Sequence, residues 1–92
     1  MIPLENAPKR QEDAAVKVLI EAGYIKNFEH IFDFIPISVV SRDSGSNYVR
    51  FIRYIDNPSR FKLKDLFILA KLFEVEEMKL IALVYIQLKP NA

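Results

Sequence analysis

Apolar side chains recur at intervals of three and four residues along most of this chain, which is the pattern of helices that bury one face. The first such segment covers residues 11–22 and ends before Gly23, a residue suited to stop a helix. Its predicted apolar face consists of Ala14, Ala15, Val18, Leu19 and Ala22. A short second helix follows, capped by Asn27 and ended by Pro36. Its predicted apolar face is Phe28, Ile31, Phe32 and Ile35.

Two helices joined by a short turn are predicted next, the first over residues 36–44. Gly45 then allows a left-handed turn. Ser46 or Asn47 caps the second helix, which runs to Ile55 and is stopped by the following Asn-Pro pair. The side chains predicted to face inward are Ile37, Val40 and Ser41 in the first helix, and Phe51, Tyr54 and Ile55 in the second.

The last two helices are predicted over residues 63–73 and 76–88. The inner face of the first is predicted to be Leu63, Leu66, Phe67, Ala70 and Phe73. The second is apolar around almost its whole circumference, through Met78, Leu80, Ile81, Ala82, Leu83, Val84, Tyr85, Ile86 and Leu88. Because a helix that is apolar all round needs cover all round, we expect a homodimer through residues 77–88. The alternative is that the helix at 11–22 covers the second face.

These elements predict an all-α fold, a bundle of five to six helices in a single domain at 11–92, preceded by a flexible arm at 1–10. The 92 residues contain no Cys, which excludes disulfides, a thiol nucleophile and thiolate metal sites. No apolar run approaches the roughly 18–20 residues of a transmembrane helix, and the start lacks the pattern of a signal peptide. We therefore expect a soluble, cytoplasmic protein with no cofactor, no membrane contact and no evident small-molecule ligand.

The net charge of +1 hides an uneven distribution along the chain. Residues 1–41 hold four basic and six acidic side chains, residues 65–92 hold three and four, and residues 42–64 hold six and two, or +4. The six cations of this window are Arg42, Arg50, Arg53, Arg60, Lys62 and Lys64. Arg presents a planar donor fork that suits phosphate and guanine edges. The window is therefore interpreted either as a nucleic-acid contact surface or as a solvated charged face.

Residues 37–54 have the spacing of a helix-turn-helix. Val40, with the small Ser41 beside it, suits a first helix that the second crosses closely, and Gly45 and Asn47 suit the turn and the cap. The anchors of the second helix are Phe51 and Tyr54, which leaves Tyr48, Val49, Ile52 and Arg53 facing outward. In a helix-turn-helix, this outer face enters the major groove of DNA.

Residues 36–84 resemble the Cro/C1-type, or lambda-repressor-like, helix-turn-helix domain. A loop with proline leads to a helix with the apolar pattern of that family, in the run Leu63, Leu66, Leu69, Ala70, Phe73 and Val75. The helix at 11–22 is then an added element. The whole chain is also similar to small Bacteroidetes-type proteins with the pattern I-P-x-x-V-V-x-x-D-x-G, which is found here at residues 35–45.

The resemblance implies a role in binding double-stranded DNA and regulating transcription, with two classes of contact. The side chains that it implies at base edges are Asn47, Tyr48, Val49, Ile52 and Arg53. Those that it implies at phosphates are Ser38, with Arg42, Arg50, Arg60 and Lys62 as additional contacts. The alternative is a protein-interaction module on the same fold that no longer reads DNA, because Val49 and Ile52 are apolar where DNA readers are usually polar.

Two departures from the family's pattern carry structural expectations. Ser44 and Ser46 flank Gly45 where the family usually has apolar residues, so the turn is poorly filled unless an aromatic neighbour substitutes. Lys62 stands where Ser or Thr normally caps the following helix, and an ammonium accepts no N–H. No residue pattern supports an enzyme; His30 with its acidic neighbours is interpreted as a surface histidine.

Overall fold

The computed structural model describes residues 11–88, and the arm predicted at 1–10 lies outside the described residues. The described part contains five α-helices: α1 (Gln11–Glu21), α2 (Ile37–Asp43), α3 (Tyr48–Asp56), α4 (Leu63–Phe73) and α5 (Glu77–Leu88). Two short 3-10 helices, η2 (Glu29–Asp33) and η3 (Pro58–Arg60), lie between them, and residues 11–88 contain no strand. The all-α prediction is confirmed, and the short second helix is η2, a single 3-10 segment.

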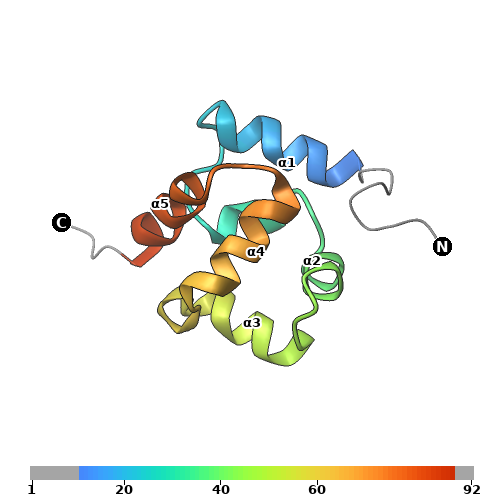
Figure 1. The fold of residues 1–92 in the computed structure, drawn as a ribbon. Coiled ribbons are helices and arrows are strands. Elements are labelled where there is room, and N and C mark those ends of the chain that lie inside the picture. Colours follow the sequence, from blue (N-terminus) through green and yellow to red (C-terminus); the bar gives the residue numbers. More distant parts are fainter. Residues whose placement is uncertain (1–10, 89–92) are drawn as a thin grey trace.

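Helix α4 crosses the centre of the molecule, with α1 above it, α5 to its left, α3 below and α2 to the right (Figure 1). It contacts both α1 and α5, whereas α3 contacts α2 and η3. This arrangement leaves α3 along one edge of the bundle (Figure 1). Among the described residues, no helix combines the length and the apolarity that crossing a membrane requires.

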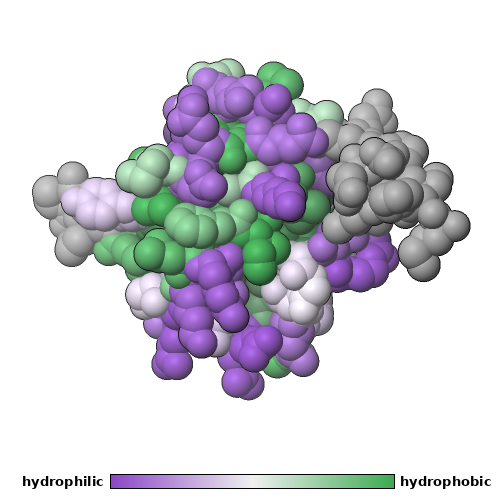
Figure 2. Space-filling view, viewed as in Figure 1, coloured by the Kyte–Doolittle hydropathy of each residue, from purple (hydrophilic) through white to green (hydrophobic). Residues whose placement is uncertain are grey.

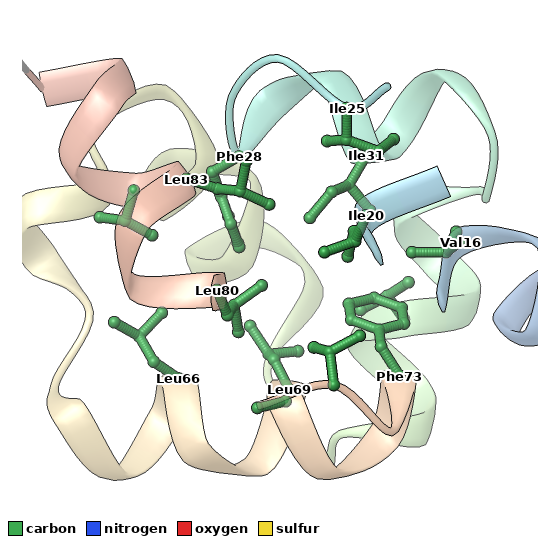
Figure 3. Close-up of a cluster of buried hydrophobic side chains, with 14 of the residues drawn as sticks. Val16, Ile20, Ile25, Phe28, Ile31, Leu66, Leu69, Phe73, Leu80 and Leu83 are labelled. Carbon is green, nitrogen blue, oxygen red and sulfur yellow. The ribbon is translucent and has the colours of Figure 1, made fainter. Parts of the chain in front are cut away.

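The core lies between α1, the segment around η2, α4 and α5 (Figure 3). The side chains that converge there in the close-up include Val16, Ile20, Phe28, Ile31, Leu66, Leu69, Phe73, Leu80 and Leu83. Burial of this apolar surface is the main favourable contribution to folding. Because α4 supplies residues from the middle of this cluster, it joins α1 and α5 in one core.

The predicted inner face of α1 is wrong, because the helix is rotated about its axis relative to the prediction. Asp13, Val16 and Ile20 are buried and Leu19 is half-buried. The predicted positions that prove to be exposed are Ala14, Ala15, Val18 and Ala22. The larger side chains of Val16 and Ile20 remove more apolar surface from water than three alanines do, so the helix turns them inward.

The predicted inner face of α4 is also wrong, and α5 leaves one of its apolar faces uncovered. Leu63 and Phe67 are 61% and 45% exposed, because α4 buries the stripe Leu66, Leu69, Ala70 and Phe73 instead. Helix α5 buries Leu80, Leu83 and Val84, but Tyr85 and Ile86 are 64% and 51% exposed. Helix α1 therefore does not cover the second face of α5, which remains at the surface of this chain.

Candidate functional site

The corner between α2 and α3 has the local chemistry that the sequence predicts. Gly45 has a φ of 75°, in the left-handed region, and its N–H donates to the carbonyl of Arg42 at 3.1 Å. Asn47 caps α3, since its Oδ1 accepts from the backbone N–H of Arg50 at 3.0 Å. The direction in which α3 leaves the corner is thus set by the glycine and by the cap.

Serine hydrogen bonds close this corner in place of apolar side chains. Ser41 is buried and Ser44 and Ser46 are half-buried. The Oγ of Ser41 donates to the carbonyl of Ser46 at 2.9 Å, and the N–H of Ser46 donates back to the carbonyl of Ser41 at 2.9 Å. The Oγ of Ser44 lies 3.2 Å from the carbonyl of Ser41 and 3.1 Å from the Oγ of Ser46. The corner is therefore satisfied by polar contacts among its serines.

An aromatic cluster supports the inner face of α3. The buried ring of Phe51 meets Phe32 and Phe61 edge to face, with ring centroids 5.9 and 5.7 Å apart. Tyr54 meets Phe61 at 5.3 Å, also edge to face. Such T-shaped pairs are favourable beyond the area that they bury. Phe51 and Ile55 are buried as predicted, whereas Tyr54 is half-buried.

The other end of α3 is held by Gln87 of α5. Its Nε2 donates to the carbonyl of Ile55 at 2.8 Å, and its Oε1 accepts from the N–H of Glu29 at 2.7 Å. The carbonyl of Ile55 belongs to the last turn of α3, where carbonyls have no partner within the helix. Gln87 thus connects α3, η2 and α5, a role that no local sequence pattern signals.

Almost all the predicted contact residues lie at the surface. Ile52 is half-buried, and the exposed members of the set are Ser38, Arg42, Asn47, Tyr48, Val49, Arg50, Arg53, Arg60 and Lys62. On α3 the buried pair Phe51 and Ile55 defines the inner face, so Arg53 lies opposite it, with Val49 and Arg50 on either side. The outer face of α3 therefore presents two guanidinium groups and an apolar side chain, with the exposed carboxylate of Asp56 at its C-terminal end.

A pocket of about 270 Å³ gathers part of this set between α3 and the start of α4. Four cationic side chains line it, namely Arg50, Arg60, Lys62 and Lys64. Ser38, Arg42 and Arg53 do not line this pocket. Lys64 is not among the predicted contact residues, although it belongs to the positively charged window at 42–64, which is the signal that points to it.

Within the part of the chain that the structure describes, the four cations of this pocket are not paired with carboxylates. Within residues 13–88, none of Arg50, Arg60, Lys62 and Lys64 forms an ion pair, whereas the Nε of Arg42 lies 3.6 Å from Asp43. Asp65 lines the pocket too, and its Oδ2 accepts from the backbone N–H of Lys62 at 3.0 Å. Asp65 thus supplies one half of a capping box at the start of α4, and its own N–H donates to the backbone carbonyl of Lys62 at 3.0 Å.

His30 has structural partners and lies outside the candidate site. Its Nδ1 accepts from the N–H of Lys26 at 2.9 Å, and its Nε2 lies 3.8 Å from Asp33. Its ring also contacts Tyr24 and Phe34. Among the described residues there is no group of three side chains that could hold a metal ion.

Comparisons of this chain with protein-family models, curated proteins and solved structures returned no match. The candidate site is accordingly interpreted from its own geometry and charge.

Proposed function

We propose that this protein is a small DNA-binding transcriptional regulator in which α2 and α3 form a helix-turn-helix and α3 enters the major groove. The observation that carries this proposal is the charge on and around α3: all six cations of residues 42–64 are exposed. A polyanion that lies along this edge meets several of them at once, and each phosphate contact releases counterions.

The outer face of α3 supplies the base contacts in this proposal. Arg53 at its centre is suited to a bidentate contact with guanine, and Val49 beside it to the methyl group of thymine. A bidentate base contact discriminates by about 1–3 kcal/mol. The fixed corner at Gly45 and the contact of Gln87 with Ile55 hold α3 at both ends, which favours a rigid reading helix.

The proposed phosphate contacts surround α3. Arg50, Arg60 and Lys62 come from one pocket beside α3, and Arg42 and Ser38 come from α2. Phosphate contacts fix the register of a protein on DNA without reading its sequence. The two sets together give affinity and specificity from different side chains.

We also propose that the regulator is a homodimer through α5. Met78, Tyr85 and Ile86 are exposed on this helix, and Figure 2 shows apolar side chains gathered over α4 and α5, with hydrophilic ones above and below. A shallow groove of about 450 Å³, with Ile20, Ile25, Ala82 and Ile86 in its lining, extends this surface. An exposed apolar surface of this kind favours association.

The position of α5 suits a dimer that binds DNA. Helix α3 lies on the lower edge of the bundle, while α5 lies at its left side (Figure 1). A two-fold axis beside α5 can therefore leave both copies of α3 on one side of the pair. Such a dimer can address two half-sites about one helical turn apart.

The test is fluorescence anisotropy of the full chain on a labelled mixed-sequence duplex at low and at moderate salt. Wild-type protein is expected to bind with micromolar affinity that weakens steeply with salt. Arg53→Ala should weaken binding, whereas Lys71→Ala, which removes an exposed cation of α4 that lines neither the pocket nor the groove, should have little effect. Absence of binding at low salt contradicts the proposal.

A second candidate function has its own observation. Tyr48 and Val49 are 48% and 57% exposed on the outer face of α3, and an exposed apolar pair suits a protein surface as well as a groove. If the anisotropy experiment finds no binding, α3 becomes the candidate docking helix of a protein-interaction module.

A further inference from the structure

The pocket beside α3 has a composition that the outer face of α3 lacks. Its rim carries four cations and one carboxylate, a net charge of +3, within one concave surface. By contrast, the only cations on α3 itself are Arg50 and Arg53. Low-dielectric walls around a cleft lined with one sign of charge concentrate its field. The pocket is therefore the strongest site for a single anion on this edge of the molecule.

The single carboxylate of the pocket does not cancel this charge. Asp65 is half-buried and is occupied with the N–H of Lys62 at 3.0 Å. The four cations are exposed, and within residues 13–88 they have no carboxylate partner. Their side chains are free to converge on a ligand that brings its own negative charge.

The other lining residues are Ser46 and three aromatic side chains. The ring of Phe61 meets Tyr54 at 5.3 Å and Phe51 at 5.7 Å, edge to face in both pairs. Flat carbon surfaces beside cations suit a ligand that has both an apolar part and a charged group. The volume of about 270 Å³ is below the roughly 300–1,000 Å³ of pockets for drug-sized ligands. It suits a ligand no larger than one nucleotide unit.

We propose that this pocket binds one phosphate ester of a sugar, with Arg60 and Lys64 on the phosphate and Phe61 and Tyr54 against the sugar. Two sources share this chemistry, the backbone of bound DNA and a free nucleotide. Only the first of these rests on the proposed function. If DNA supplies the phosphate, a free nucleotide competes with DNA and acts as a regulator of the protein.

The first arm of the experiment needs no DNA. Amide signals of the ¹⁵N-labelled protein are followed while inorganic phosphate, adenosine 5′-monophosphate or adenosine is added. Both phosphates should shift signals around Arg50 and from Arg60 to Asp65, and adenosine 5′-monophosphate should do so at a lower concentration because its sugar also meets Phe61 and Tyr54. Adenosine, which lacks the phosphate, should shift these signals only at much higher concentration. Arg60→Gln and Lys64→Gln should each weaken phosphate binding about threefold. Lys71→Gln, an equal charge change further along α4, should leave it unchanged.

Two results would overturn the inference. One is that amide signals near every exposed lysine shift equally, and the other is that Lys71→Gln weakens phosphate binding as much as Arg60→Gln does. The three substituted residues are all exposed, so each variant is expected to fold. An unfolding temperature equal to that of the wild type confirms this.

The second arm distinguishes the two sources by anisotropy on a labelled duplex. If DNA supplies the phosphate, Arg60→Gln lowers the slope of log K against log salt by about one, and adenosine 5′-monophosphate displaces the duplex. If a free nucleotide is the source, it binds without affecting the duplex. Phosphate binding with no duplex binding contradicts the proposed function and leaves the pocket intact. Duplex binding with no phosphate response in the first arm contradicts the pocket alone.

Discussion

Helices α3 and α5 both leave part of their surface uncovered, but the chemistry of the two uncovered faces is opposite. The outer face of α3 carries Arg50 and Arg53 together with Val49, and further exposed cations follow it at Arg60 and Lys62. The outer face of α5 carries Met78, Tyr85, Ile86 and Leu88. Figure 2 shows the same contrast, with hydrophilic side chains at the lower edge and apolar ones over α4 and α5.

One small domain thus presents a cationic surface and an apolar surface, and we propose a different partner for each. Water solvates exposed guanidinium groups well, so α3 can remain uncovered until a polyanion arrives. The apolar face of α5 has no such solvation and favours contact with another protein surface. We propose DNA as the partner of the first surface and a second copy of the chain as the partner of the other.

The largest expected effect comes from the ring that supports α3. Phe51→Ala should destabilise the protein by about 3–5 kcal/mol, because it empties a buried site in the aromatic cluster. Phe67→Ala is the matched control, since Phe67 is exposed on α4 and its truncation should cost less than about 1 kcal/mol. Urea unfolding followed by circular dichroism measures both. Equal effects of the two substitutions would contradict the burial of α3 described above.

The next largest effect comes from the contact between the two compared helices. Gln87→Ala should cost about 1–3 kcal/mol, because the carbonyl of Ile55 loses its donor. Lys71→Ala, at an exposed position of α4 outside the pocket and the groove, should be nearly neutral in the same urea unfolding experiment. A neutral Gln87→Ala would show that α5 does not hold the end of α3.

Sequence reasoning succeeds at α3 and fails at α1 and α4 for a definable reason. In α3 the inner face can be formed by Phe51, Ile52 and Ile55 or by Val49 and the two tyrosines, and the cap at Asn47 fixes the residue at which the helix starts. In α4 the positions 66–70 are all apolar, so spacing alone cannot choose the buried stripe. The packing of α4 against α1 and α5 makes that choice, and Phe67 is left outside.

The candidate site divides in the same way between local and long-range features. Gly45 and the Asn47 cap are local, and the sequence predicts them correctly. The serine hydrogen bonds at the corner and the contact of Gln87 with Ile55 depend on how side chains meet in space. The pocket around Lys64 also depends on the connection through η3, whose path brings residues 60–65 beside α3.

The association of α5 is the third effect. Ile86→Glu should weaken self-association at least tenfold, about 1.4 kcal/mol, because it places a charge in the proposed interface. Val18→Glu makes the same change at an exposed apolar position of α1 and should leave association unchanged. Sedimentation equilibrium provides the measurement. A wild-type chain that stays monomeric at every concentration contradicts the dimer.

The smallest effect concerns the corner that starts α3. Gly45 has a φ of 75°, and a Cβ added there meets no atom within 4 Å. Gly45→Ala should therefore destabilise the protein by about 1 kcal/mol through backbone strain alone. A lower midpoint of thermal unfolding is expected. An unchanged midpoint would show that backbone conformation does not limit this corner.

The most direct test of the central claim is an amide chemical-shift titration of the full chain with a short duplex. We expect the chemical-shift changes to concentrate at residues 47–53 and 60–65. Residues 78–86 should show only the changes that also appear when the protein is diluted without DNA. A footprint centred on α5, or one spread evenly over the surface, would contradict the assignment of DNA to α3.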